Sequence, residues 1–157
     1  MRGAAATIAL LTISCLLTAC AGSGGGGGGG APKPACKPPA TPTISFSSNI
    51  QPIFNASCAL AGCHVGPVPT GPVDLSVGQA YAQTVNVKSA QVPTLKRFLP
   101  GKPDDSYIIR KIEGGPNLAG VQMPQGCPGA CLNGAKALTP DNIAAIRQWV
   151  TECAPNN

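Results

Sequence analysis

Apolar side chains recur at helical intervals in four stretches of the chain, all of which follow residue 43. In 46–54, 77–85, 107–112 and 143–153 they stand three or four positions apart, as in a helix with one buried face. No stretch has the alternation of apolar and polar residues that a half-buried strand requires. The pattern therefore predicts an all-α fold with about four short helices. The predicted inner faces are Phe46, Ile50, Ile53 and Phe54; Val77, Ala80, Tyr81 and Val85; Tyr107, Ile108, Ile109 and Ile112; and Ile143, Ile146, Trp149, Val150 and Cys153.

Residues that favour helix ends flank these stretches, and long loops separate them. The loops 65–73 and 114–138 are rich in glycine and proline, and loops of this length in a small domain usually have a function or need a further stabiliser. We expect Ser47 or Ser48 to be the N-cap of the first helix, and Ser76 with Gln79 to form a capping box at the start of the second. Gly114 is expected to end the third helix, and Thr139-Pro140-Asp141 to begin the fourth.

Residues 1–19 have the composition of a secretory signal peptide. Arg2 precedes an apolar run that ends in Leu-Thr-Ala-Cys at Cys20. This ending resembles the lipobox of bacterial lipoproteins, in which cleavage before the cysteine exposes it for lipidation. The mature chain is then expected to start at Cys20, lipid-anchored in the bacterial cell envelope and facing the periplasm, at the outer membrane. An ordinary cleaved signal, with Cys20 incidental, is the alternative.

Residues 20–43 are predicted to be a tether, and residues 44–157 the folded body. Seven consecutive glycines and a proline-rich segment cannot bury apolar surface, so this stretch is expected to act as a spacer. Cys36 interrupts the proline-rich part, where a pure linker has no use for a thiol. We therefore expect Cys36 to bond to the folded body.

Composition narrows the candidate chemistry to a few residues. The chain has eight Cys, a single His at position 64, and Met123 as its only internal Met. So many cysteines in a small exported chain indicate disulfides or cofactor chemistry. The chain also has three Phe, two Tyr and one Trp, which are few for filling a core.

Charge adds little to this picture. Without Arg2 the chain carries ten basic and six acidic side chains. The basic pairs at 96–97 and 110–111 are expected to be solvated surface. Because no aromatic residues are interleaved with them, they do not indicate a nucleic-acid partner.

Cys58, Cys63 and His64 form the motif with the most specific chemistry. The usual attachment site for c-type haem is C-x-x-C-H, in which two thiols form thioethers and the adjacent imidazole binds the iron. Here the spacer, residues 59–62, is two residues longer than usual. Its residues are small or apolar, and Gly62 permits a sharp turn. The motif predicts haem attachment through both cysteines, with His64 as an iron ligand.

Met123 is the candidate for the opposite side of the iron. It lies in the sequence GVQMPQG, away from any helical apolar stripe, where glycines and Pro124 allow a firm loop. Ligation by one His and one Met is the cytochrome c pattern, and it raises the reduction potential relative to two His ligands.

About 110 residues of the body carry a resemblance to a known family. The matching stretches are, in order, SFSSNIQPIFNASC, the Cys63-His64 pair, VDLSVGQAYAQTV, PGKPDDSYIIRKI, MPQG and LTPDNIAAIRQWV. They resemble small bacterial monohaem cytochrome c domains, including those of planctomycete-type proteins. The resemblance implies a cytochrome c-like fold around one covalent haem c, with Cys58 and Cys63 as thioether sites, His64 as proximal ligand and Met123 as distal ligand. It implies an electron carrier that meets redox partner proteins, and not an enzyme.

Other uses of these residues stay open. A disulfide between Cys58 and Cys63, with His64 on the surface, would give a disulfide-stapled, lipid-anchored binding module without haem. A zinc site from these three residues and Cys127 or Cys131 has suitable ligand types, although thiols outside the cytosol tend to oxidise. A haem site that opens at Met123 would instead suit sensing or ligand chemistry.

The cysteines outside this motif have a structural explanation. Cys36, Cys127, Cys131 and Cys153 allow three pairings, and the sequence does not decide among them. We favour a short disulfide between Cys127 and Cys131 just after Met123. The partner of Cys36 would then be Cys153, which would fasten the tether to the last helix.

Overall fold

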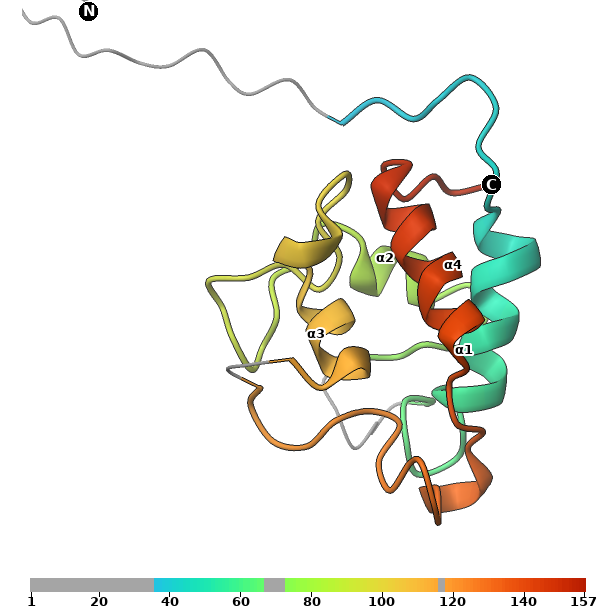
Figure 1. Cartoon of the computed structure of the whole chain (residues 1–157), viewed down its shortest axis with the longest axis vertical. Helices are drawn as coiled ribbons and strands as arrows, with labels where there is room; N and C mark the ends of the chain where they lie inside the picture. The colour runs from blue at the N-terminus through green and yellow to red at the C-terminus, as the bar shows by residue number, and fades with distance from the viewer. Residues whose placement is uncertain (1–35, 67–72, 116–117) are drawn as a thin grey trace, which may run out of the picture. The chain divides into compact units, whose positions relative to one another are not determined.

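Four short α-helices joined by long loops make up the described body of the protein (Figure 1). The computed structural model describes residues 36–66, 73–115 and 118–157. These residues contain no β-strand, only three isolated bridges. The all-α prediction is therefore confirmed. The predicted signal peptide, Cys20 and the glycine-rich part of the tether lie outside the described residues.

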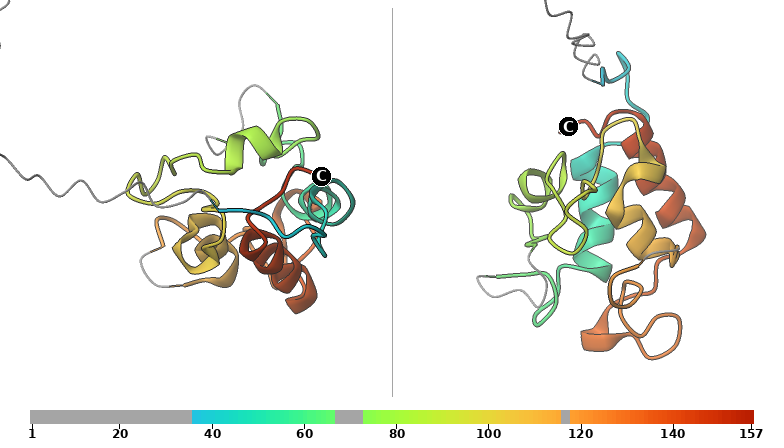
Figure 2. Two further views of the ribbon diagram at one scale, coloured as in Figure 1. Left: turned by 90° about the horizontal axis from the view of Figure 1, so that it is seen from above. Right: turned by 90° about the vertical axis from the view of Figure 1, so that its left-hand side faces the viewer.

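The last helix packs between two other helices. It has α3 on one side and the first helix, η1 with α1, on the other (Figures 1 and 2). No helix within the described ranges is long and apolar enough to cross a bilayer. The elements in chain order are η1 (Phe46–Ile50), α1 (Gln51–Ser57), α2 (Ala80–Thr84), η2 (Pro103–Asp105), α3 (Tyr107–Glu113), η3 (Leu132–Gly134) and α4 (Pro140–Thr151).

The first helix starts earlier than the sequence predicted. It begins with the π-helical turn η1, whose cap is Ser45, and the Ser45 hydroxyl accepts a hydrogen bond from the Ser48 amide. The prediction of Ser47 or Ser48 as the cap is therefore wrong. Phe46 is 7% exposed, and its ring centroid lies 5.3 Å from that of Trp149, so the helical turn extends to bring this ring into the core.

The second helix starts later than predicted. Gln79 is the N-cap of α2 and makes no side-chain capping bond, so the predicted capping box is wrong. The Ser76 amide instead donates to the side chain of Asp74, and the chain bends before the helix begins. Val77 is consequently 71% exposed and does not belong to the inner face.

The ends of the last two helices follow their local signals. Gly114 ends α3 with a φ of 75°, a conformation that glycine adopts at little cost. Thr139 caps α4 through the Asn142 amide, and Pro140 occupies the first turn. These predictions are confirmed. Cys153, however, lies beyond the end of α4 with a φ of 70°, so it does not continue the inner face of the helix.

The core is built around Trp149, which is fully buried in α4. The rings of Phe46 and Phe98 each have their centroid 5.3 Å from that of Trp149, and Phe54 stacks on Phe98 at 6.4 Å. The indole Nε1–H donates to the carbonyl of Pro155 at 2.9 Å, so the buried donor is satisfied. All the aromatic residues except Tyr107 therefore gather into one cluster.

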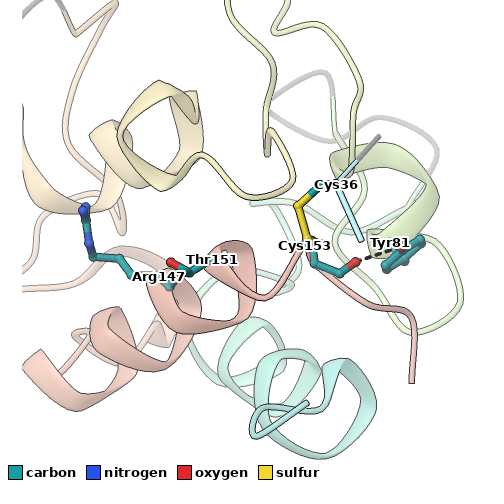
Figure 3. Close-up of a disulfide and its surroundings, with 6 residues drawn as sticks. Cys36, Tyr81, Arg147, Thr151 and Cys153 are labelled. Carbon is teal, nitrogen blue, oxygen red and sulfur yellow. Dashed lines mark hydrogen bonds between the residues drawn. A yellow bond between two sulfur atoms is a disulfide. The ribbon is translucent and has the colours of Figure 1, made fainter. Parts of the chain in front are cut away.

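A disulfide joins the end of the predicted tether to the segment after α4 (Figure 3). Cys36 pairs with Cys153, whose Cα atoms are 5.5 Å apart. Gly101 lies against this bond, with a φ of 74° and no room for a Cβ beside the Cys36 sulfur. Next to it, the Tyr81 hydroxyl donates to the carbonyl of Ala154 at 2.9 Å (Figure 3). The described end of the tether is thus fixed to the body.

Two loops meet at the end of the body opposite this disulfide. One loop follows α1 and the other precedes α4, and both lie away from the chain end marked C (Figures 1 and 2). The disulfide between Cys127 and Cys131 closes part of the second loop. These two loops carry the candidate residues of the sequence.

Candidate functional site

A cavity of about 380 Å³ opens between α1, α3 and the two loops. Cys58, Cys63, His64 and Met123 all line it. These are the four residues that the sequence singled out for cofactor binding. Volumes of about 300–1,000 Å³ are typical of sites for small molecules and cofactors. The fold therefore brings the predicted cofactor residues to one cavity of suitable size.

The remaining wall is mostly apolar but carries two positive charges. Its charged residues are Arg97 and Lys111, and none of its described residues has a carboxylate. Positive charge in the wall of a cavity favours a ligand with acidic groups. The cavity thus suits a largely apolar ligand that carries negative charge. The apolar wall residues include Phe54, Val73, Leu75, Ile108, Ile112, Leu138 and Ile146.

The segment between Cys58 and His64 forms one tight turn after α1. The Cys63 amide donates to the carbonyl of Leu60 at 2.9 Å, and the His64 amide donates to the carbonyl of Cys58 at 3.2 Å. Gly62 turns the chain with a φ of 76°, as its position in the spacer suggested. The longer spacer therefore still returns His64 to the start of the motif.

The His64 ring is held by the backbone on the far side of the loop. Its Nδ1 lies 3.3 Å from the carbonyl oxygen of Val73. A carbonyl can only accept, so Nδ1 must carry the proton, and Nε2 keeps a lone pair for a metal. Burial lowers the pKa of His64, and the positive charges of Lys111 and Arg97 lower it further. Both effects favour the neutral imidazole, which is the form that binds metals.

The two motif cysteines are free thiols, whereas the other four described cysteines form disulfides. Burial raises the pKa of Cys58 to about 12, and Cys63 nearby adds to this effect. The Asn133 side-chain amide donates to the Cys63 sulfur at 3.3 Å. Asn133 was not among the residues that the sequence singled out, because it lies 70 positions away. The Cys58 thiol is therefore protonated, and both cysteines lie at the cavity wall.

Met123 is attached to α3 by its own backbone. Its amide donates to the carbonyl of Lys111 at 2.8 Å. The side chain of the preceding residue, Gln122, donates to the carbonyl of Ile112 at 2.9 Å. Pro124, which follows, is buried. The thioether therefore stands on a segment whose backbone position is fixed relative to α3.

Lys111 corrects the prediction that the basic pairs are solvated surface. It is only 8% exposed, and its ammonium donates to the carbonyls of Ala119 and Val121. The sequence contains one signal that could have indicated this position. Tyr107 lies four residues earlier on the helix, so both side chains share the face that lines the cavity.

The zinc alternative is not supported by the cysteine positions. Cys127 and Cys131 are bonded to each other, so neither thiol is available as a fourth ligand. Within the described ranges, no group of three or more His, Cys, Asp and Glu side chains is placed to hold a metal ion. That finding leaves ligation by one His and one Met untested, because Met is not among those residue types.

Neither a protein-family model, nor a curated protein, nor a solved structure matches this chain. The cytochrome c resemblance therefore remains a prediction. A function for the cavity has to be proposed from the residues that form it.

Proposed function

We propose that residues 44–157 form a monohaem c-type cytochrome domain that carries single electrons outside the cytoplasm. The observation that supports this most strongly is the common cavity. It brings together two free thiols, one neutral imidazole and the only internal Met of the chain. A covalently attached haem with His and Met ligands uses all four of these groups.

The residues of the cavity fit this group in type and in state. Cys58 and Cys63 would form the two thioether bonds, His64 would be the proximal ligand through Nε2, and Met123 the distal ligand through sulfur. Iron held in this way supplies reversible one-electron oxidation and reduction. With one His and one Met both bound to the iron, no position would be left for a substrate, and we therefore propose an electron carrier and not an enzyme.

The other residues of the site would prepare the cavity for this role. The carbonyl of Val73 keeps the His64 ring in one orientation and one tautomer. Arg97 and Lys111 provide positive charge opposite the acidic side chains of the porphyrin. The apolar wall would limit the access of water to a bound haem and so would help His64 and Met123 to remain bound to its iron.

The location follows from the lipobox and from the fixed end of the tether. We propose that Cys20 is acylated and holds the protein at the outer membrane, facing the periplasm. Cys36 is bonded to the body at the end opposite the cavity loops. This arrangement supports an encounter between the cavity end and redox partner proteins, and it gives no role to nucleic acid.

The test is to produce the full chain in a host that has haem-attachment machinery. We expect an intact mass equal to the apoprotein plus one haem, and a visible spectrum that survives denaturation and acid extraction. The double variant Cys58→Ser/Cys63→Ser should carry no covalent haem. The matched control, Cys127→Ser/Cys131→Ser, removes two cysteines from the same end of the body and should still carry it.

A disulfide-stapled binding module without haem is the second candidate. The two disulfides favour it. The cavity would then take an apolar ligand with a carboxylate, attracted by Arg97 and Lys111. A wild-type mass without haem, together with a rise in Tm on addition of a fatty acid, would select this function over the cytochrome.

A further inference from the structure

Lys111 is buried in the last turn of α3 without a carboxylate partner. The residue is 8% exposed, and no ion pair of Lys111 occurs among the described residues. A buried ammonium is unfavourable unless hydrogen bonds replace its hydration. Two backbone carbonyls provide these bonds, at 2.9 Å from Ala119 and at 2.6 Å from Val121. Both carbonyls belong to the loop that leads to Met123.

The same residue also holds the loop through its backbone. The carbonyl of Lys111 accepts the amide hydrogen of Met123 at 2.8 Å. Lys111 therefore contacts the loop at 119, 121 and 123, three alternate positions of the segment. Gly120, between the first two, has a φ of 74°, and the segment forms no helix or strand that would fix its course.

Tyr107 supports this contact from one helical turn earlier. Its hydroxyl lies 3.3 Å from both the amide nitrogen and the carbonyl oxygen of Ala119. It also donates to the side chain of Gln91 at 3.0 Å, which limits its movement. The start of the loop is thus held by two side chains of α3, and the rest of the loop by Lys111.

We propose that Lys111 is the positioning residue for Met123. Its ammonium holds the loop 119–123 against α3, and this sets where the thioether lies in the cavity. A lysine suits this role because its compact ammonium has three donors, two of which the loop carbonyls use. The proposal rests on the proposed function for its effect on iron ligation. The attachment of the loop does not depend on haem.

The test compares two lysine variants of the haem-loaded full chain. Lys111→Leu replaces the ammonium with an apolar side chain that has no donor and no sulfur. Lys136→Leu removes the same charge from an exposed position in the loop that precedes α4. We expect Lys111→Leu to keep its covalent haem, to lose most of the ferric sulfur-to-iron band, and to bind carbon monoxide in the ferrous state. Lys136→Leu should behave like the wild type.

These readouts separate positioning from general stability. A variant that is only less stable would show a lower Tm with an unchanged sulfur-to-iron band. Retention of the full band and of the closed ferrous state in Lys111→Leu would overturn the proposal. If that variant does not accumulate, nitrogen NMR of the wild-type lysine ammonium groups decides the question. One ammonium should be protected from exchange with water and coupled to the carbonyls of Ala119 and Val121, and its absence would also overturn the proposal.

Failure of the proposed function would give a different result. If the wild-type protein carries no covalent haem, the proposed cytochrome function is wrong. The protected ammonium of Lys111 should still be detected in that haem-free protein. A haem-loaded wild type without that ammonium contradicts only the positioning role.

Discussion

The carboxylate of Glu152 accepts hydrogen bonds from both the amide and the hydroxyl of Thr43. The amide of Ile44 donates to the same carboxylate at 3.2 Å. Thr43 is the last residue of the predicted tether, and Glu152 follows directly after α4. The carboxylate therefore fixes the point where the tether enters the body, one residue before Cys153 of the long-range disulfide.

Because of these bonds, the contribution of Glu152 to the stability of the fold depends on pH in the acid range. The hydrogen bond from Thr43, followed by that from Gln148, lowers the pKa of Glu152 from 4.5 to about 2. Between these two values the unfolded chain takes up a proton that the folded chain does not. The free energy of unfolding should therefore fall as the pH drops from about 4.5 to about 2.

Glu152→Gln should remove this pH dependence and lower the stability near neutral pH. Loss of hydrogen bonds to a charged group typically costs about 1.5–3 kcal/mol. Denaturant unfolding of both proteins at several pH values measures the difference, which should shrink as the solution becomes more acidic. Asp105→Asn, which changes an exposed carboxylate, is the control. A constant difference between Glu152→Gln and the wild type down to pH 2 would contradict the assignment.

Removal of the long-range disulfide should destabilise the protein more than removal of the short one. Cys36 and Cys153 are 117 residues apart, and a loop of about this length corresponds to about 4.7 kcal/mol in the loop-entropy model. Cys127 and Cys131 are 4 residues apart, for which the same model gives about 2 kcal/mol. Unfolding of the two double Ser variants measures both effects. Equal losses would show that chain entropy is not the main contribution.

Met123→Ala should open the proposed haem site without releasing the haem. A thioether is a soft ligand that stabilises ferrous iron, so its loss should lower the reduction potential. The variant should lack the weak sulfur-to-iron band of the ferric state and should bind carbon monoxide when reduced. Its haem should stay covalently attached through Cys58 and Cys63. A wild type that already binds carbon monoxide readily would contradict a firm Met123 ligand and favour sensing or ligand chemistry.

Cys20→Ser should release the protein from the membrane fraction. The reason is that acylation requires the thiol at the end of the lipobox, and several acyl chains give stable anchoring. Fractionation of cells followed by mass measurement of the membrane-bound form provides the test. Cys15→Ser, which alters a cysteine within the predicted signal peptide, should leave anchoring unchanged. Equal membrane binding of Cys20→Ser and the wild type would exclude the lipobox.

Local signals in the sequence were sufficient where a helix end depends on its immediate neighbours. Thr139 with Asn142 begins α4, and Gly114 ends α3, as predicted. Each of these ends depends on one side chain and one backbone conformation within four residues. The signals failed where distant contacts compete with them. Phe46 packs on Trp149 and moves the first helix start, and the bond between Asp74 and Ser76 delays the second.

The sequence by itself determined the helical fold class and the types of residue available for a site. The spacing of apolar positions and the single His and internal Met are properties of the chain alone. Only the tertiary structure placed Met123 and His64 in one cavity, because their approach depends on the packing of α3 against α4. Only the tertiary structure could show that Lys111 is buried, since a charged side chain enters a core when distant carbonyls replace its water.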